Sequence, residues 1–381
     1  MKTINKDTLG RLIRRRTEDE LSQGRICGKE ITVLQDGETV FHVTFGRISV
    51  GGAPLRENMI YRIASMTKPV TAAAVLILAD AGKIDLYAPV SDYYPEAAHM
   101  RVATVENGKI ISLRPVETPI RIIDLLSHTS GIGCSPVLET LKESDARLPF
   151  GEAVKKILSY PLSFEPRLWQ AYSPTAAFDV AAGIIEIVSD RPYAVFLKKK
   201  IFEPLGMDDT GFDLSPEQRE RTVSIYDRDE DGRGFDSPTV DSCVFEDFLP
   251  ERTAAGAGLA STAADYSVFA ETLRRGGISP SGVRILSEEA VKLMITPNVP
   301  DSIPMGYERW GLGVRVITDA RYPHGLGPGC FGWSGAYGTH FWVDPENRIT
   351  AVMMKNSRYD GGAGNMSACG FERDVYDSAE V

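Results

Sequence analysis

The chain has 381 residues, of which 43% are hydrophobic, and its formal net charge is -10 at pH 7. A chain of this length and composition can bury a large core, as one big domain or two interlocked ones. The acidic balance, with no dense block of Lys and Arg, disfavours nucleic acid as a partner.

The first 24 residues mix basic and acidic side chains, which is not the pattern of a secretory signal. No segment approaches the roughly 18 consecutive apolar residues that a membrane-spanning helix requires. We therefore expect a soluble, cytoplasmic protein that has no membrane partner.

The cysteines are odd in number, lie far apart and show no C-x-x-C spacing, so free buried thiols are expected. The histidines form no H-E-x-x-H pair, and neither a metal site nor a cofactor is expected. The five cysteines are Cys27, Cys134, Cys243, Cys330 and Cys369.

The N-terminal segment predicts a polar helix over residues 8–23, followed by two strands over 31–34 and 39–45. Asp36 and Gly37 separate the two strands, and Asp-Gly between β-rich runs is typical of a hairpin.

The next element changes to a helical period. Apolar residues recur at helical spacing from Val70 to Ala81, and Gly82 stands where a C-terminal cap is expected. Ser65 therefore lies at or just before the N-terminus of a helix.

The middle of the chain, from about residue 88 to residue 250, has the pattern of helices and irregular loops with frequent Pro and Asp. Strand patterns return near the C-terminus, and the last two of them form a hairpin through an Asp-Pro-Glu-Asn turn. These strands are expected over residues 311–317, 331–334, 339–343 and 349–354.

The expected fold is of the α/β (α+β) class and is assembled from both ends of the chain. Residues 1–87 and 251–381 form a sheet domain flanked by helices, and residues 88–250 form an inserted, mostly helical domain. An active site between the two domains is then expected.

One helical turn can make a serine reactive. Serine hydroxyls are poor nucleophiles at neutral pH and need a nearby proton acceptor. In the S-x-x-K turn of Ser65 and Lys68, positions i and i+3 share one face of a helix, which brings the amine beside the hydroxyl. Desolvation disfavours a charged lysine, so Lys68 can act as a base if it is buried. A capping serine followed by a solvated lysine is the structural alternative.

Three short motifs follow one another along the chain: Ser65-x-x-Lys68, Tyr172-Ser173-Pro174 and Trp333-Ser334-Gly335. In this order they resemble the motifs of class C β-lactamases, penicillin-binding proteins and family VIII carboxylesterases. The resemblance implies a β-lactamase/transpeptidase-like fold with an antiparallel sheet. It also implies a serine hydrolase that forms an acyl-enzyme on Ser65, with Lys68 and Tyr172 passing the proton.

The third motif begins with Trp333, where the family usually has lysine or histidine. A cation there helps to hold the carboxylate of penicillins and D-alanyl peptides, and an indole cannot supply that charge. The tryptophan resembles the variant found in β-lactamase-like carboxylesterases, so a small-molecule ester without charge is the expected substrate. Together with Ser173, the third motif supplies the expected substrate-binding residues Trp333, Ser334 and Gly335.

The resemblance further implies an oxyanion hole formed by the main-chain N–H groups of Ser65 and Ala336. Such donors stabilise charge that develops only in the transition state, typically by about 3 to 4 kcal/mol for one donor.

Other chemistries are disfavoured. No G-x-S-x-G elbow of an α/β-hydrolase occurs, and Gly256-Ala257-Gly258 lacks the third glycine of a dinucleotide fingerprint. His128 is expected to be structural.

Three other functions stay open on the same scaffold. A β-lactamase, D-amino-acid peptidase or amidase would use the same serine, with Arg315, Lys355 or Arg358 holding the substrate carboxylate. An acyltransferase and a non-catalytic binding protein are the other two.

The C-terminal segment, residues 359–381, is rich in glycine and polar side chains. The family usually closes with a long helix packed on the sheet, but here any helix is expected to be short. The chain end is expected to be frayed, or held by a second subunit of a homo-oligomer.

Overall fold

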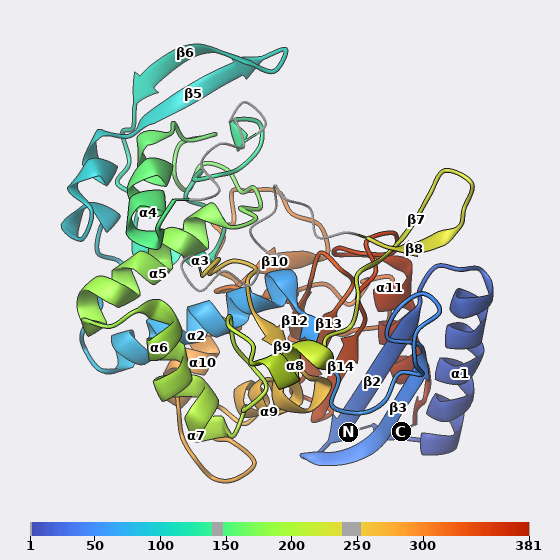
Figure 1. Ribbon diagram of the computed structural model, residues 1–381. Coiled ribbons are helices and arrows are strands. Elements are labelled where there is room, and N and C mark those ends of the chain that lie inside the picture. Colours follow the sequence, from blue (N-terminus) through green and yellow to red (C-terminus); the bar gives the residue numbers. More distant parts are fainter. Residues whose placement is uncertain (1, 139–147, 238–252, 381) are drawn as a thin grey trace.

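The protein is built around a seven-stranded antiparallel sheet in the order β10-β11-β12-β13-β14-β2-β3. The structure is a computed structural model and describes residues 2–138, 148–237 and 253–380. N-terminal and C-terminal strands lie side by side where β14 pairs with β2 (Figure 1). The strands are β2 (Gly28–Gln35), β3 (Glu38–Gly46), β10 (Glu308–Trp310), β11 (Arg315–Ile317), β12 (Phe331–Ser334), β13 (His340–Asp344) and β14 (Ile349–Met354).

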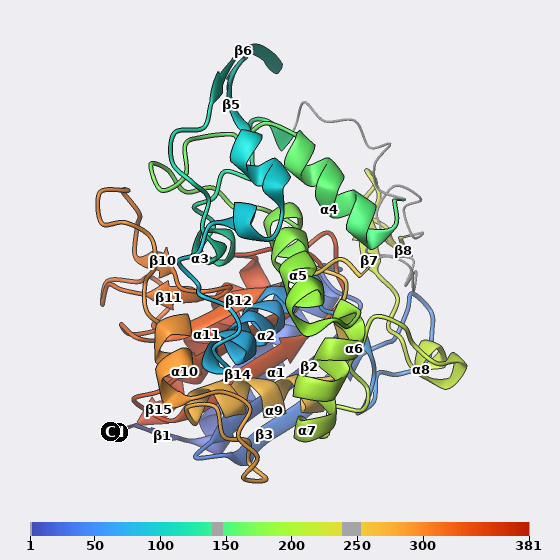
Figure 2. The same ribbon diagram turned by 90° about the vertical axis from the view of Figure 1, so that its left-hand side faces the viewer.

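Helices cover both faces of the sheet (Figure 1, Figure 2). Helices α1 (Lys6–Ser22) and α11 (Met366–Asp377) lie on one face, and α2 (Thr67–Asp80) and α9 (Ala263–Arg274) lie on the other. Side chains alternate between these faces along each strand. On β13, for example, Trp342 belongs to the core under α11, whereas its neighbour Phe341 belongs to the core under α2. The expected antiparallel sheet with flanking helices is confirmed.

A mostly helical region lies beyond α2, with α5 packed against α2, α3 and α4. Figure 1 shows this region at the left, from cyan to green. Its α5 helix is buried along most of its length because it is rich in Ala, Ile and Val. The remaining α-helices are α3 (Ile122–Leu126), α4 (Phe150–Ser159), α5 (Ala176–Ser189), α6 (Tyr193–Leu197), α7 (Glu203–Leu205), α8 (Pro216–Glu220) and α10 (Glu288–Met294).

The same region holds a β-hairpin that the sequence interpretation missed. Strands β5 (Arg101–Glu106) and β6 (Lys109–Pro115) project from the molecule (Figure 1). Every residue of β6 is exposed, so the hairpin carries no alternation of buried and polar residues that would predict a strand. The available signal was its Asn107-Gly108 turn, with φ of 50° and 71°, because Asn-Gly favours tight hairpins. A second short hairpin pairs β7 (Tyr226–Arg228) with β8 (Gly234–Asp236).

The single strand predicted over residues 311–317 is wrong in its extent. The chain leaves the sheet between β10 and β11 and turns at Gly313, whose φ is 71°. A Cβ atom at Gly313 would lie 2.8 Å from the Lys68 carbonyl oxygen. The segment therefore packs against the first turn of α2, which hydrophobic patterning alone cannot predict.

The C-terminal expectation is also wrong. Helix α11 has 12 residues and begins with an Asn365 side-chain cap. Its Gly370 lets Arg16 of α1 approach, since a Cβ there would lie 2.5 Å from that guanidinium. The chain then ends in β15 (Ala379–Glu380), which pairs with β1 (Thr3–Ile4) of the same chain.

Four cysteines, Cys27, Cys134, Cys330 and Cys369, are free thiols, and Cys243 lies outside the described residues. In the described parts of the chain, no helix combines the length and apolar character needed to cross a bilayer. Those same parts contain no group of three or more His, Cys, Asp and Glu side chains arranged to hold a metal. A cytoplasmic location and a homo-oligomer stay predictions.

Candidate active site

Ser65 lies in a strained 3₁₀ turn, Ala64–Met66, that leads directly into α2. Ala64 has φ of 43°, a conformation that costs a non-glycine residue about 1 to 3 kcal/mol and persists only where the surroundings impose it. Its neighbours Ala64 and Met66 are buried, whereas Ser65 is partly exposed. The turn thus leaves the Ser65 side chain partly accessible to solvent, while the residues on both sides of it are buried.

Contacts from distant segments hold this turn. The strand before it, β4 (Tyr61–Arg62), pairs with β9 (Ala260–Ser261). The carbonyl oxygen of Ile63 accepts a hydrogen bond from Thr339 Oγ1 at 3.1 Å, and that of Met66 accepts one from the Tyr266 hydroxyl at 2.7 Å. The position of Ser65 is therefore set by the sheet and by α9 together.

The Lys68 amine lies beside the Ser65 hydroxyl, with Nζ 3.3 Å from Oγ. It also donates hydrogen bonds to the carbonyl oxygens of Pro174 at 2.6 Å and Gly256 at 2.8 Å. A neutral amine has two N–H groups and one lone pair. If the carbonyls take both N–H groups, the lone pair is left facing the Ser65 hydroxyl.

Burial favours the neutral, basic form of this amine. Lys68 is fully buried, and desolvation lowers its pKa well below the usual value of 10.5, although the negative charge of Asp179 opposes the shift. The nearby His128 is also fully buried, and its pKa is lowered mainly by burial and further by Lys68.

Gly256 contributes its backbone to the site and was not predicted as a site residue. A Cβ at Gly256 would lie 2.8 Å from both the Pro174 carbonyl oxygen and the Thr175 Cα atom. Only glycine therefore lets the two carbonyls converge on Lys68. The glycine-rich run Ala255-Gly256-Ala257-Gly258 indicated close backbone packing. It could not indicate a hydrogen bond to Lys68, because every residue type has a main-chain carbonyl.

Tyr172 places its phenol at the same point. Its hydroxyl is hydrogen-bonded to Ser65 and accepts a hydrogen bond from Trp333 Nε1 at 3.2 Å. Its ring centroid lies 4.6 Å from Lys68 Nζ. Burial raises the pKa of Tyr172 to about 12, although these two hydrogen bonds oppose the shift, so the phenol is protonated at neutral pH.

An aromatic cluster fixes the direction of the phenol. Tyr172 packs against the rings of His128, Trp310 and Trp333, with centroid separations of 4.7, 5.8 and 5.4 Å. Because indole N–H is only a donor, Trp333 leaves the Tyr172 proton free to point at Ser65.

Ser173 and Ser334 are both held by other protein groups. Ser173 is buried, and its main-chain N–H donates to His128 Nδ1 at 3.1 Å. The Ser334 hydroxyl bonds His340 Nδ1 at 2.8 Å, on the face of the sheet opposite to Trp333. The Ser334 side chain therefore points away from Trp333, and its backbone is the part that lies in the strand beside Trp333.

The turn after β12 carries the second predicted oxyanion donor. Gly335 packs directly on the serine turn, since a Cβ there would lie 2.4 Å from the Ile63 carbonyl oxygen. Ala336 is exposed, and within the described residues its main-chain N–H has no protein acceptor. An unpaired N–H beside the serine turn is the feature that an oxyanion hole requires.

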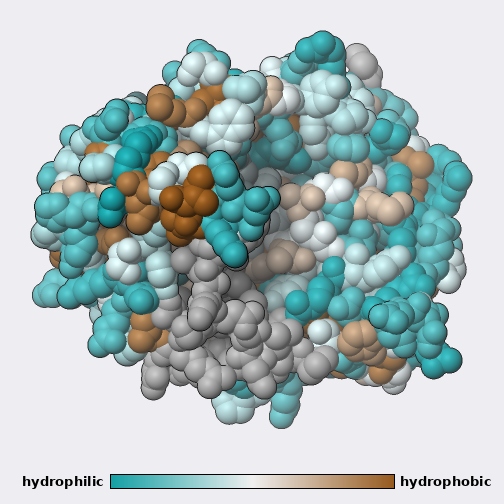
Figure 3. All heavy atoms as spheres, turned by 90° about the horizontal axis from the view of Figure 1, so that it is seen from above, coloured by the Kyte–Doolittle hydropathy of each residue, from teal (hydrophilic) through white to brown (hydrophobic). Residues whose placement is uncertain are grey.

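The structure thus brings the predicted nucleophile, base and phenol together from α2 and from the segment before α5, with Trp333 from β12 beside them. The Ser65 hydroxyl therefore lies next to both the Lys68 amine and the Tyr172 phenol. Figure 3, seen from above, shows a hollow between the helical region at the left and the sheet region at the right.

The fold places the protein in the class of β-lactamase/transpeptidase-fold proteins. The solved structure titled EstCE1, a hydrolase with promiscuous acyltransferase activity, superposes with a TM-score of 0.80 at 22% identity, over 97% of this chain and 99% of that one. The Beta-lactamase family model matches residues 11–367. The chain therefore belongs to the Beta-lactamase family, and the resemblance drawn from its three motifs is confirmed.

Two relatives of known sequence match most of the chain. Protein Rv1367c of Mycobacterium tuberculosis is 34% identical, over 80% of this chain and 79% of its own. Esterase EstB of Burkholderia gladioli is 28% identical, over 92% and 91%. Other relatives carry names of acyltransferases and D-alanyl-D-alanine carboxypeptidases, so the family is one of serine hydrolases and related acyl-transfer enzymes.

The geometry predicts a specific pH dependence. If neutral Lys68 is the base, kcat/KM for p-nitrophenyl acetate should rise with pH as the Lys68 ammonium loses its proton, with a midpoint well below 10.5. No loss from ionisation of Tyr172 is expected until pH approaches about 12. A pH profile measured on the folded enzyme checks this, and a midpoint near 10.5 would contradict the proposed base.

Proposed function

We propose that this protein is a carboxylesterase that cleaves small, uncharged esters through an acyl-enzyme on Ser65. The observation that carries the proposal is the hydrogen bond from the Trp333 indole to the Tyr172 hydroxyl, 3.2 Å long, beside the Ser65–Lys68 pair. Trp333 thus places a neutral indole at a position where a carboxylate-binding enzyme needs a cation.

The proposed reaction has two halves. Ser65 Oγ attacks the ester carbonyl while its proton passes to Lys68 Nζ, and the N–H groups of Ser65 and Ala336 hold the oxyanion. The proton then passes through the Tyr172 phenol to the leaving alkoxide, which departs as the alcohol. Water attacks the acyl-enzyme with the same groups acting in reverse, so the acid is released and Ser65 regains its proton.

Of the three cations that the sequence offers as partners for a substrate carboxylate, two are engaged by other groups in the described structure. Arg315 is buried and donates to Glu372 at 2.5 Å, and Lys355 is fully buried against Asp360. Arg358 lies near the turn that follows β12, with Cζ 5.6 Å from the centroid of the Tyr337 ring. Its Nε is 3.8 Å from Asp227 Oδ2. This arrangement favours esters over β-lactams and D-alanyl peptides.

A substrate panel tests the assignment. p-Nitrophenyl acetate and butyrate should be cleaved with a kcat/KM about 10²-fold or more above that for nitrocefin or D-alanyl p-nitroanilide. Ser65→Ala is the control for background hydrolysis. Preferred cleavage of nitrocefin or the anilide would reject the esterase assignment and favour a peptidase or β-lactamase, with Arg358 as the candidate partner of the carboxylate.

A further inference from the structure

A second fully buried lysine lies below the turn that carries Ala336, and the proposed chemistry does not use it. Lys355, just after β14, donates from Nζ to the Asp360 carboxylate at 2.7 Å, to the Asp360 carbonyl at 2.5 Å and to Asn365 Oδ1 at 3.3 Å. An ammonium has three N–H groups, and all three have acceptors here. Burial lowers the pKa of Lys355 to about 8, although the charge of Asp360 opposes the shift.

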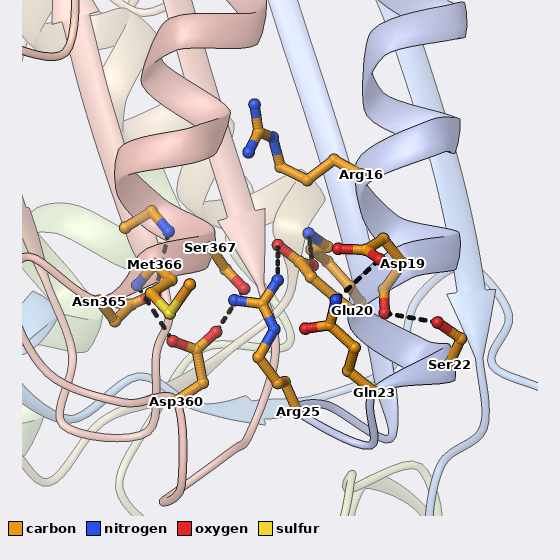
Figure 4. A network of polar contacts seen from close by, with 12 residues as sticks. Arg16, Asp19, Glu20, Ser22, Gln23, Arg25, Asp360, Asn365, Met366 and Ser367 are labelled. Carbon is orange, nitrogen blue, oxygen red and sulfur yellow. Dashed lines mark hydrogen bonds and ion pairs between the residues drawn. The ribbon is translucent and has the colours of Figure 1, made fainter.

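Asp360 joins this lysine to the start of α11. Its carboxylate accepts hydrogen bonds from the Ser367 hydroxyl and from the Met366 main-chain N–H at 3.1 Å. Figure 4 shows Asp360 among Asn365, Met366 and Ser367, and facing Arg25. Burial alone would raise the pKa of Asp360, but Lys355 and the hydrogen bond from Ser367 lower it. The pair is therefore ionic, and both charged groups have hydrogen-bond partners in addition to each other.

The lysine stem lies directly under the turn of residues 335–338. Gly338 has φ of 87°, and a Cβ there would lie 2.2 Å from Lys355 Cε and 2.7 Å from the Asp360 carbonyl oxygen. A side chain at position 338 would clash with Lys355 and with the Asp360 backbone, so the turn packs directly on the ion pair. The position of the turn therefore depends on the position of Lys355.

The loop around Asp360, residues 357–362, packs against the same turn at other points. A Cβ at Gly361 would lie 2.1 Å from the Ala336 carbonyl oxygen. The N–H of Gly362 donates to the Gly335 carbonyl at 3.2 Å, and the N–H of Ser357 donates to the Tyr337 carbonyl at 2.7 Å. Residues on both sides of Ala336 are thus fixed by the loop that Lys355 and Asp360 organise.

We propose that the Lys355–Asp360 ion pair is a positioning element for the oxyanion donor of Ala336. The inference rests on the proposed function and names a residue pair that acts through the turn without touching substrate. Replacing a buried ion pair with well-packed apolar side chains is often neutral or stabilising, so stability alone does not account for this one. Displacement of a catalytic group by about 1 Å can cost about 10²-fold in rate, which makes rigid support of the turn valuable.

The test compares Lys355→Met with Lys29→Met. Lys29 is a similarly buried lysine that is hydrogen-bonded to Glu20. It acts on Asp360 and Lys355 through its charge but, in the described structure, has no hydrogen bond to either residue or to the turn, so it controls for the loss of a nearby buried charge. For p-nitrophenyl acetate, Lys355→Met should lower kcat by about 10- to 100-fold with KM changed less than about 3-fold. Lys29→Met should keep kcat within about 2-fold of wild type at a temperature where thermal melts show both variants folded.

A phosphonate ester reports on the oxyanion hole independently of ester turnover. The rate at which the neutral diester ethyl p-nitrophenyl ethylphosphonate labels Ser65 should fall in Lys355→Met by the same factor as kcat, because its tetrahedral adduct uses the same donors. If the wild type labels at Ser65 but does not cleave esters, the proposed function fails while the labelling rates still test the positioning role.

Gly361→Ala provides a second variant if Lys355→Met does not fold. The added methyl would lie 2.1 Å from the Ala336 carbonyl oxygen and 2.7 Å from the Ser357 carbonyl oxygen, so it displaces the turn without removing either charge of the ion pair. Gly361 is not in the left-handed region, so backbone strain does not add to this effect. A loss of kcat and of labelling rate is again expected. Unchanged kcat and labelling in a folded Lys355→Met or Gly361→Ala variant would overturn the proposal, as would losses of the same size in Lys29→Met.

Discussion

Replacing Ser65 with alanine should lower kcat/KM for p-nitrophenyl esters by about 10⁴-fold or more and abolish covalent labelling by a phosphonate ester. The reason is that the hydroxyl is the only group in the proposed mechanism that forms a bond to the substrate carbonyl. Lys68 and Tyr172 would remain in place, but they can only move a proton. Steady-state kinetics and intact-protein mass spectrometry measure the two effects.

The matched control for this variant is Ser267→Ala. Ser267 is a buried serine of α9 whose hydroxyl donates to the Ala263 carbonyl at 2.6 Å, away from the site. It should keep wild-type kinetics and labelling. Residual ester turnover within about 10-fold of wild type in Ser65→Ala, or a mass adduct that persists, would show that another group is the nucleophile.

Replacing Lys68 with methionine should lower kcat/KM and the labelling rate of Ser65 by about 10²- to 10⁴-fold, the range typical for loss of a general base. The methionine has a similar volume but supplies no basic group to accept the Ser65 proton. Lys29→Met again serves as the control, because it removes a buried amine that is remote from Ser65. Activity of Lys68→Met near the wild-type level would reject Lys68 as the base.

The same substitution should change how stability depends on pH. The pKa of Lys68 is lower in the folded than in the unfolded protein, so the unfolded state binds more protons between the two pKa values. The contribution of this group to stability therefore rises with pH across that window and is complete above about 10.5. Lys68→Met should remove this rise, as measured by thermal melts of both proteins over a pH series. An unchanged slope would indicate that the folded-state pKa is not lowered.

Local patterns predicted much of the architecture. The hairpin of β2 and β3 follows from its Asp-Gly turn, the last two strands follow from an Asp-Pro-Glu-Asn turn, and helix α2 follows from its helical period. All of these signals depend on near neighbours in sequence. The errors lie where such signals are absent. The β5–β6 hairpin is exposed, and the break at Gly313 is imposed by packing on α2. Helix α11 forms despite Gly370 because that glycine receives the Arg16 side chain.

At the site, the sequence alone determined what one helical turn and three motif positions can encode: a serine, a lysine on the same face, a tyrosine and a tryptophan in place of a cation. Only the tertiary structure decided what surrounds them. The two carbonyls that receive Lys68 come from Pro174 and Gly256, far away in sequence. Backbone acceptors, burial and the support of a turn by Lys355 depend on contacts between distant segments, and no residue type or spacing records those contacts.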